Sequence, residues 1–219
     1  MPVTVKICGL TSAADAAAAL EVGADFLGFV FFPASRRCLH RADWAWVRRV
    51  EGRPKVGVFR DQDRGYIEAA REEAGLDLVQ LHGSEPPELC AALGGPERVI
   101  KAVSVADTVV WEEVARYAEV ARILFDTATP TGGGSGRRFD WRLLADRPPG
   151  LAFWLAGGLH ADNVGEAIRS LQPAGVDVAS GVEVATGRKD AARMRAFIQA
   201  VRAAAGRPDA PADGGRGDE

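Results

Sequence analysis

The 219-residue sequence has few of the residues that bind metals or form disulfides. It contains three cysteines, Cys8, Cys38 and Cys90, which are an odd number without a C-x-x-C pair, and three widely spaced histidines. These residues provide neither a disulfide framework nor zinc-ligand spacing, so the sequence predicts a protein of a reducing compartment without a bound metal.

Excess positive charge and long apolar runs are also missing. The formal net charge of -3 gives no general attraction to nucleic acid or to an anionic membrane. No run approaches the ~18 apolar residues needed to span a membrane, and no apolar signal segment opens the chain. We therefore expect a soluble, cytoplasmic protein without nucleic-acid or membrane partners.

A regular alternation of strand-length apolar runs and helical segments fills most of the chain. The expected strands cover 3–8, 26–31, 55–59, 76–81, 98–103, 122–126, 151–156 and 176–179, and the expected helices cover 12–22, 41–50, 61–74, 88–93, 108–117, 141–145, 161–170 and 190–204. These units recur at a spacing near the ~30 residues of a βαβ unit. They predict an α/β fold, a single (β/α)8 TIM barrel with eight parallel strands, over residues 1–205.

Two further features of the sequence bear on the fold and its boundaries. An open doubly wound sheet is the alternative fold, but the G-x-G-x-x-G motif that would favour it does not follow the first strand. Residues 206–219 contain Gly, Pro, Asp and Arg without a large apolar residue, which predicts a disordered tail.

The active site of such a barrel lies at the carboxyl ends of its strands. The residues expected there are Cys8, Ser35, Arg36, Arg37, Gln80, His82, Asp126, Gly157, Gly158, Asp177, Ser180 and Gly181. Each of these residues also has a simpler interpretation. Cys8 could be a buried core cysteine, Asp126 could cap the turn after its strand, and the two arginines could be a solvated surface pair.

Glycine-bearing turns follow the last two expected strands. Gly157, Gly158 and the Ser180-Gly181 pair allow backbone amides to approach an anion, at the usual phosphate position of this architecture, although a plain tight turn is the alternative. The run 132–136 is interpreted either as a mobile lid over Asp126 or as a surface loop.

Cys8 and Asp126 are candidates for an acid–base pair. On the first and sixth strands they would flank a substrate from different sides, one removing a proton while the other donates one, as a cofactor-free isomerisation of a sugar phosphate requires. Lys6 lies two residues before Cys8 on the same strand face, and we hypothesise that its ammonium favours the thiolate.

Several of these segments occur together, in this order, in one known family. They are KICGLT at 6–11, GFVFFP at 28–33 with Ser35 and Arg37, VQLHG at 79–83, LFD at 124–126 with the glycines of 133–136, LAGGL at 155–159, and VDVASGVE at 176–183 with Lys189 and Asp190. From Val3 to about Val201 the chain resembles the phosphoribosylanthranilate isomerases of tryptophan biosynthesis.

The resemblance implies an Amadori rearrangement of N-(5-phosphoribosyl)anthranilate to 1-(2-carboxyphenylamino)-1-deoxyribulose 5-phosphate, without a cofactor. Asp126 would be the general acid and Cys8 the general base. Arg37 would pair with the anthranilate carboxylate, a task suited to guanidinium. The position before it, Arg36, is commonly proline or lysine in the family.

The resemblance also implies roles for the remaining candidates. Gly157, Gly158, Ser180 and Gly181 would bind the phosphate, and Gln80, His82 and Asp177 would line the substrate pocket. A histidine-pathway isomerase is the closest rival, but it resembles two half-barrels and uses aspartates as both base and acid. A non-catalytic phosphate-binding barrel is the other alternative. The family implies a monomer or a homodimer.

Overall fold

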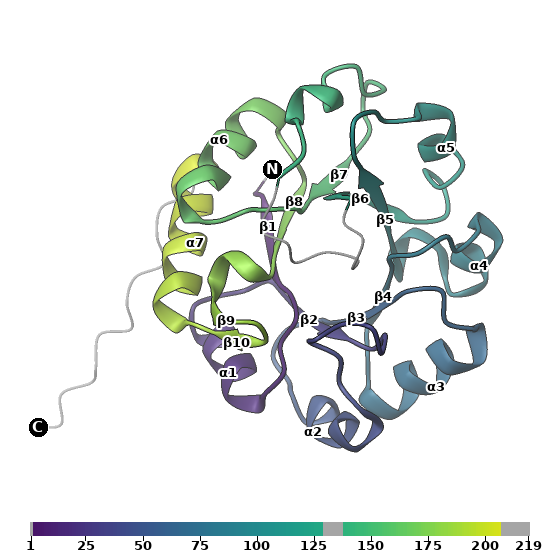
Figure 1. Cartoon of the computed structure of the whole chain (residues 1–219), viewed down its shortest axis with the longest axis vertical. Coiled ribbons are helices and arrows are strands. Elements are labelled where there is room, and N and C mark those ends of the chain that lie inside the picture. Colours follow the sequence, from purple (N-terminus) through teal and green to yellow (C-terminus); the bar gives the residue numbers. More distant parts are fainter. Residues whose placement is uncertain (1, 129–137, 207–219) are drawn as a thin grey trace, which may run out of the picture.

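The strands close into a barrel (Figure 1). In the computed structural model, which describes residues 2–128 and 138–206, parallel strands follow one another around a closed ring in chain order, β1 to β8. They span Thr4–Ile7 (β1), Phe26–Val30 (β2), Lys55–Phe59 (β3), Leu78–Leu81 (β4), Val99–Val105 (β5), Arg122–Thr127 (β6), Phe153–Leu155 (β7) and Gly175–Val178 (β8). The ring closes between β1 and β8, where Lys6 is opposite Asp177. The predicted TIM barrel is confirmed.

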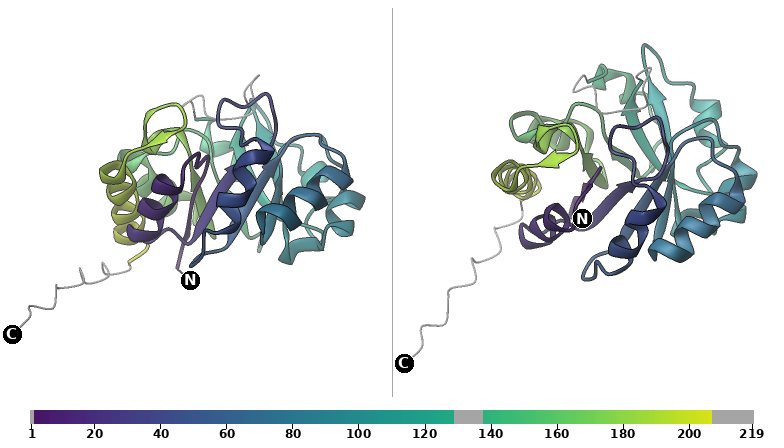
Figure 2. Two further views of the ribbon diagram at one scale, coloured as in Figure 1. Left: turned by 90° about the horizontal axis from the view of Figure 1, so that it is seen from below. Right: turned by 60° about the horizontal axis from the view of Figure 1, so that its bottom comes forward.

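Helices surround the barrel (Figure 2). They span Ala13–Glu21 (α1), Trp44–Arg48 (α2), Arg64–Ala74 (α3), Pro87–Ala92 (α4), Trp111–Ala115 (α5), Ala161–Leu171 (α6) and Ala191–Ala204 (α7), with 3₁₀ turns at Arg41–Asp43 (η1), Gly95–Glu97 (η2), Trp141–Leu144 (η3) and Ser180–Val182 (η4). Their ends follow local chemistry: the Ser12 hydroxyl accepts from the Asp15 amide to cap α1, and α3 ends at Gly75, whose φ of 64° is left-handed.

The apolar residues divide into an inner and an outer set because side chains of a strand alternate between its two faces. Inward positions such as Val56, Ile100 and Leu124 fill the lower barrel. Outward positions such as Phe29 and Phe125 pack among the helices, in the larger cluster. Toward the carboxyl ends of the strands several inward positions are polar, and a cavity opens at this end.

Several helices are shorter than the sequence predicts, and the one predicted over 61–74 begins at Arg64. The segment predicted as a helix over 41–50 is a 3₁₀ turn followed by α2, and the buried Lys55 ammonium donates to the carbonyls of Val47, Arg48 and Val50, which ends the helix. The helix predicted over 108–117 begins only at Trp111.

A hairpin after β8 was not predicted from the sequence. Glu183–Ala185 (β9) pairs antiparallel with Arg188–Lys189 (β10). It lies at the end of the barrel opposite the N-terminus, the end that carries the strand tips (Figure 2). The glycine-rich run 132–136, which the sequence left open as a lid or a surface loop, and the predicted tail, apart from Gly206, lie outside the described residues.

Candidate active site

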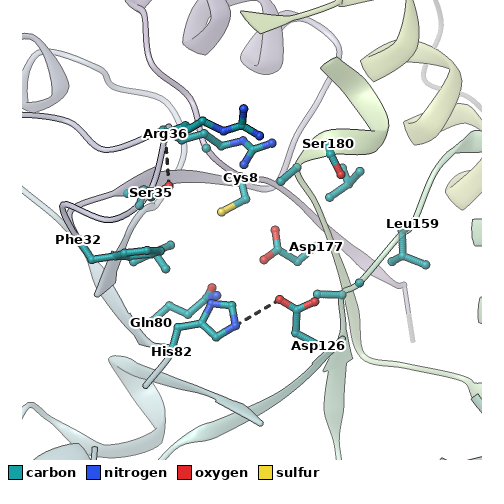
Figure 3. A pocket seen from close by; sticks show the side chains of 18 of the residues that line it. Cys8, Phe32, Ser35, Arg36, Gln80, His82, Asp126, Leu159, Asp177 and Ser180 are labelled. Atoms are coloured by element: carbon teal, nitrogen blue, oxygen red, sulfur yellow. Dashed lines mark hydrogen bonds and ion pairs between the residues drawn. The ribbon is translucent and has the colours of Figure 1, made fainter. Parts of the chain in front are cut away.

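A cavity of about 360 Å³ opens at the carboxyl ends of the strands (Figure 3). Among the residues that line it are nine of the ten for which the family resemblance implies a role: Cys8, Arg37, Gln80, His82, Asp126, Gly157, Gly158, Asp177 and Ser180. The tenth, Gly181, does not line it; the glycine lies against the Leu159 carbonyl, where a Cβ atom would collide. An apolar wall that the sequence did not single out is formed by Val30, Phe32 and Val58.

Asp126 points into the cavity from β6 and is held at both carboxylate oxygens (Figure 3). Its Oδ1 accepts a hydrogen bond of 2.7 Å from the Thr127 amide. Its Oδ2 lies 3.2 Å from His82 Nε2, at the tip of β4. Because both contacts fix the plane of the carboxyl group, its orientation toward the cavity is set before a substrate binds.

Cys8 enters the cavity from the tip of β1, beside a buried ion pair. Lys6 Nζ lies 2.7 Å from Asp177 Oδ2, and the Lys6 side chain is fully buried. On β2, Gly28 leaves the space for this group, because a Cβ atom there would come within 2.9 Å of Cys8 Sγ and 3.0 Å of Lys6 Cε. The lysine therefore lies next to the thiol, as the spacing of the two residues predicts.

The protonation of this group is controlled by opposing effects. Burial raises the pKa of the Cys8 thiol and Asp177 raises it further, whereas Lys6 lowers it. Burial also raises the pKa of Asp177, although Lys6 opposes this shift. Burial lowers the pKa of Lys6, but Asp177 and Cys8 outweigh burial and leave the pKa raised. Lys6 thus favours the thiolate, but the net shift of the Cys8 pKa is upward.

Two acceptor atoms at the floor of the cavity lack a donor. Gln80 Oε1 and Asp177 Oδ1 are buried and have no hydrogen-bond partner among the described residues. An unsatisfied buried acceptor costs about 1–3 kcal/mol, so the site favours a ligand that brings hydroxyl or amine donors to these atoms.

The turn after β7 exposes backbone amides. Gly157 and Gly158 have left-handed φ values of 86° and 64°. Neither amide donates a hydrogen bond to a described residue. Ser180, the first residue of the 3₁₀ turn η4 after β8, lines the same cavity. Consecutive free amides beside a hydroxyl are an arrangement that binds phosphate oxygens.

Gly157 also permits the close approach of β6, which gives a testable prediction. A Cβ atom here would collide with Thr127 Oγ1 and lie 3.0 Å from Asp126 Oδ1. We expect Gly157→Ala to lower stability by about 1–3 kcal/mol and to reduce turnover, because Asp126 must move. Thermal unfolding and steady-state kinetics measure the two effects.

Gly150→Ala is the matched control. Its φ of 81° is equally left-handed, but a Cβ atom would meet nothing within 4 Å. It should cost about 1 kcal/mol of backbone strain and leave turnover unchanged. Equal turnover in the two variants would contradict a steric link between Gly157 and Asp126.

The two arginines of the rim differ. Arg36 is exposed and lies at the mouth of the cavity (Figure 3). Arg37 is largely buried, and its Nε and Nη2 donate to the carboxylate of Glu183 at 2.8 and 2.6 Å. The guanidinium predicted to meet a substrate carboxylate is therefore already paired along one edge.

Neither a metal cluster nor a membrane-spanning helix is found in the part of the chain that the structure describes. Within residues 2–128 and 138–206, no group of three or more His, Cys, Asp or Glu side chains is arranged to hold a metal ion. No helix in the same ranges is both long and apolar enough to cross a membrane.

Comparison with known proteins identifies the family. Residues 5–200 match the sequence model of N-(5'phosphoribosyl)anthranilate (PRA) isomerase. The chain is also 48% identical over 223 residues to the N-(5'-phosphoribosyl)anthranilate isomerase of Afipia carboxidovorans, covering 98% of this chain and 95% of that protein. The chain belongs to the PRA isomerase family. Like the other members of this family, it is an isomerase.

Solved structures of PRA isomerases share the fold. A monomeric form of the dimeric enzyme from Thermotoga maritima superposes with a TM-score of 0.81 at 36% identity, covering 92% of this chain and 99% of that chain. A second PRA isomerase, in complex with reduced 1-(o-carboxyphenylamino)-1-deoxyribulose 5-phosphate, gives a TM-score of 0.78 at 35% identity, covering 92% and 99%.

The sequence analysis gave no role to Glu183 and Lys189, the buried charges next to Arg37. Both residues occur in the matching segments, but only the structure shows that they form an ion pair. The apolar wall of Val30, Phe32 and Val58 was hidden within apolar runs. The alternation of inward positions along β2 and β3 was the available signal for it.

Proposed function

We propose that this chain converts N-(5'-phosphoribosyl)anthranilate to 1-(2-carboxyphenylamino)-1-deoxyribulose 5-phosphate, a step of tryptophan biosynthesis. The observation that carries the proposal is that Cys8, directly after β1, and Asp126, on β6, point into one cavity. Membership of the PRA isomerase family supports the substrate and product.

The proposed reaction begins at Asp126. Its carboxyl group gives a proton to the furanose ring oxygen, the bond between that oxygen and C1 breaks, and the nitrogen lone pair forms the C1=N bond of an iminium ion. His82 and the Thr127 amide hold the carboxyl group in place for this transfer.

Cys8 completes the proton transfers. Its thiolate takes the proton from C2, and the C2–H electron pair forms the C1=C2 bond of an enolamine while the C=N electrons return to nitrogen. Protonation at C1 and loss of the C2 hydroxyl proton then give the ketone. The protonated imine of the substrate is the electron sink, so the steps need only a positioned acid and base.

The remaining site residues support binding of the rest of the substrate. Amides of Gly157, Gly158 and Gly181, with Ser180, would hold the phosphate. Gly181 packs against the Leu159 carbonyl, so the turns after β7 and β8 lie close together. Gln80 and Asp177 would accept from substrate hydroxyl or amine groups. The aromatic ring would pack on the apolar wall of Val30, Phe32 and Val58.

The experiment that tests the proposal follows the loss of anthranilate fluorescence when the purified protein is given N-(5'-phosphoribosyl)anthranilate. We expect saturable turnover without added metal or cofactor, and the ketose product by mass spectrometry and carbonyl trapping. A folded protein that leaves the substrate unchanged would contradict the proposal.

Lys6 gives a prediction about pH. The thiolate is the active form of Cys8, so the rate rises as pH rises through the Cys8 pKa. Because Lys6 lowers this pKa, Lys6→Met should move the rising limb of the kcat profile to higher pH and reduce kcat at pH 7.

Two further variants separate this effect from instability. Removing Lys6 leaves the buried Asp177 carboxylate without its cation, which should lower the stability of Lys6→Met. The double variant Lys6→Met/Asp177→Asn removes both charges and should recover that stability. Lys55→Met removes a buried lysine that does not line the cavity, so the pH profile should not move. A profile that does not move in Lys6→Met would refute a role for Lys6 in stabilising the thiolate.

The proposal also includes the cellular location and the oligomeric state of the protein. All three cysteines of the sequence are free thiols in the structure, which supports a cytoplasmic enzyme. The relative from Thermotoga maritima is described as dimeric. For this chain we propose a monomer or a homodimer, and analytical ultracentrifugation distinguishes the two.

A further inference from the structure

Arg37 is held along one edge and open along the other. Nε and Nη2 donate to Glu183, whereas Nη1 donates no hydrogen bond to a described residue. The side chain is only 12% exposed, and the residue lines the cavity. A Cβ atom at Gly9 would lie 2.5 Å from Arg37 Cδ, so this glycine provides the path along which the arginine reaches the site.

Glu183 is shared between two cations. Lys189 Nζ donates to Glu183 Oε1 at 2.8 Å and to the Ala179 carbonyl at 3.0 Å. The side chains of Lys189 and Glu183 are 0% and 4% exposed. When all three groups are ionised, two positive charges and one negative charge leave the cluster with a surplus of one positive charge beside the cavity.

The pKa shifts of Lys189 and Glu183 reflect their burial and their contact with each other. Burial lowers the pKa of Lys189, and Glu183 opposes that shift. Burial tends to raise the pKa of Glu183, but Arg37 and Lys189 outweigh it and lower the pKa. Glu183 is therefore ionised, and an anion entering the cavity would compensate the remaining positive charge.

The cluster is part of a fixed frame. Glu183 and Lys189 are the first and last residues of the β9–β10 hairpin. Arg193 donates from Nη1 to the Glu183 carbonyl, and Thr11 donates from its hydroxyl to the Gly187 carbonyl. The hairpin is thus tied to α7 and to the segment after β1, so the Glu183 carboxylate has a defined position.

We infer that Glu183 is a positioning residue, which fixes the Arg37 guanidinium with its Nη1 side toward the cavity, and that Lys189 supplies the surplus charge that selects a substrate with an aromatic carboxylate. A free arginine would lose rotamer entropy on binding, whereas this one is ordered beforehand. The inference rests on the proposed function and assigns its carboxylate specificity to residues that do not touch the substrate.

The test compares two ligands and several variants by calorimetry. One ligand is reduced 1-(o-carboxyphenylamino)-1-deoxyribulose 5-phosphate, and the other is the same compound with an unsubstituted phenyl ring. We expect the native protein to bind the carboxylated ligand about 10- to 100-fold more tightly, as for a charge-assisted pair in a buried site. Glu183→Gln should reduce this preference to a few-fold while changing the affinity for the phenyl ligand little.

Two more variants complete the set. Lys189→Met keeps the pair between Arg37 and Glu183 but loses the surplus positive charge, so it should also lower the preference for the carboxylated ligand. This variant replaces Glu183→Gln in the test if Glu183→Gln does not fold. Glu85→Gln is the matched control, because Glu85 is a buried carboxylate 2.7 Å from Lys101 and does not line the cavity. It should lower stability and leave the ratio of the two affinities unchanged.

Each result has one meaning. A native protein that binds neither ligand refutes the proposed function. If the native protein prefers the carboxylated ligand and folded Glu183→Gln or Lys189→Met retains this preference, the inference is overturned and the proposed function is not. Equal weakening of both ligands in Glu183→Gln also overturns it, because general damage to the site would then explain the loss. Selective loss of the carboxylate preference supports it.

Discussion

Replacing Asp126 with asparagine is expected to lower kcat by about 10²- to 10⁴-fold, the usual contribution of a general acid, with little change in KM. Asparagine has nearly the same shape and still accepts from the Thr127 amide, so binding and local structure are preserved. It has no acidic proton to give to the ring oxygen. Steady-state kinetics by fluorescence measure the loss.

The comparison of kcat with kcat/KM shows where the effect arises. If both fall by the same factor, the lost interaction is made in the transition state. A thermal unfolding curve close to that of the native protein shows that the fold is intact. Turnover within a few-fold of the native rate in folded Asp126→Asn would refute the acid role of Asp126.

Replacing Cys8 with alanine is expected to have an effect of similar size. The variant lacks the group that takes the C2 proton, so kcat should fall by about 10²- to 10⁴-fold. Cys38→Ala is the control, because Cys38 is a half-buried thiol that does not line the cavity. It should keep native turnover, and equal losses in both variants would contradict a specific role for Cys8.

The pH dependence of the native enzyme adds a check on Cys8. Burial and Asp177 raise the pKa of this thiol, so only a small part of it is thiolate at neutral pH. We therefore expect kcat to rise toward alkaline pH, up to the Cys8 pKa. Alkylation by iodoacetamide should rise over the same pH range, and a substrate analogue should protect Cys8.

The barrel could be predicted because its pattern is local and repeated. The runs at 26–31 and 56–59 are apolar on both faces, as expected for strands covered by helices outside and by packed side chains inside. Capping residues such as Ser12 and Gly75 marked helix ends correctly. Helix lengths were less accurate at 41–50, since the Lys55 ammonium that ends α2 comes from the following strand.

The positions of the candidate site residues could be predicted because the topology brings strand tips together. Cys8, Gln80 and Asp126 are far apart in sequence and line one cavity. The neighbour of Cys8 on its own strand, Lys6, could also be predicted, but partners from distant elements could not. Arg37 and Glu183, for example, are 146 positions apart, and their contact depends on the hairpin after β8. Periodicity describes which face a side chain lies on, but it does not give its contact across the barrel.

The most direct test of the central claim uses substrate deuterated at C2. In the native enzyme and in Cys8→Ser, the isotope effect on kcat reports how far removal of the C2 proton limits the rate. We expect a larger isotope effect in Cys8→Ser, because the base is impaired, and one near unity in Asp126→Asn, because ring opening then limits the rate. A large effect in Asp126→Asn together with none in Cys8→Ser would contradict the assignment of acid and base.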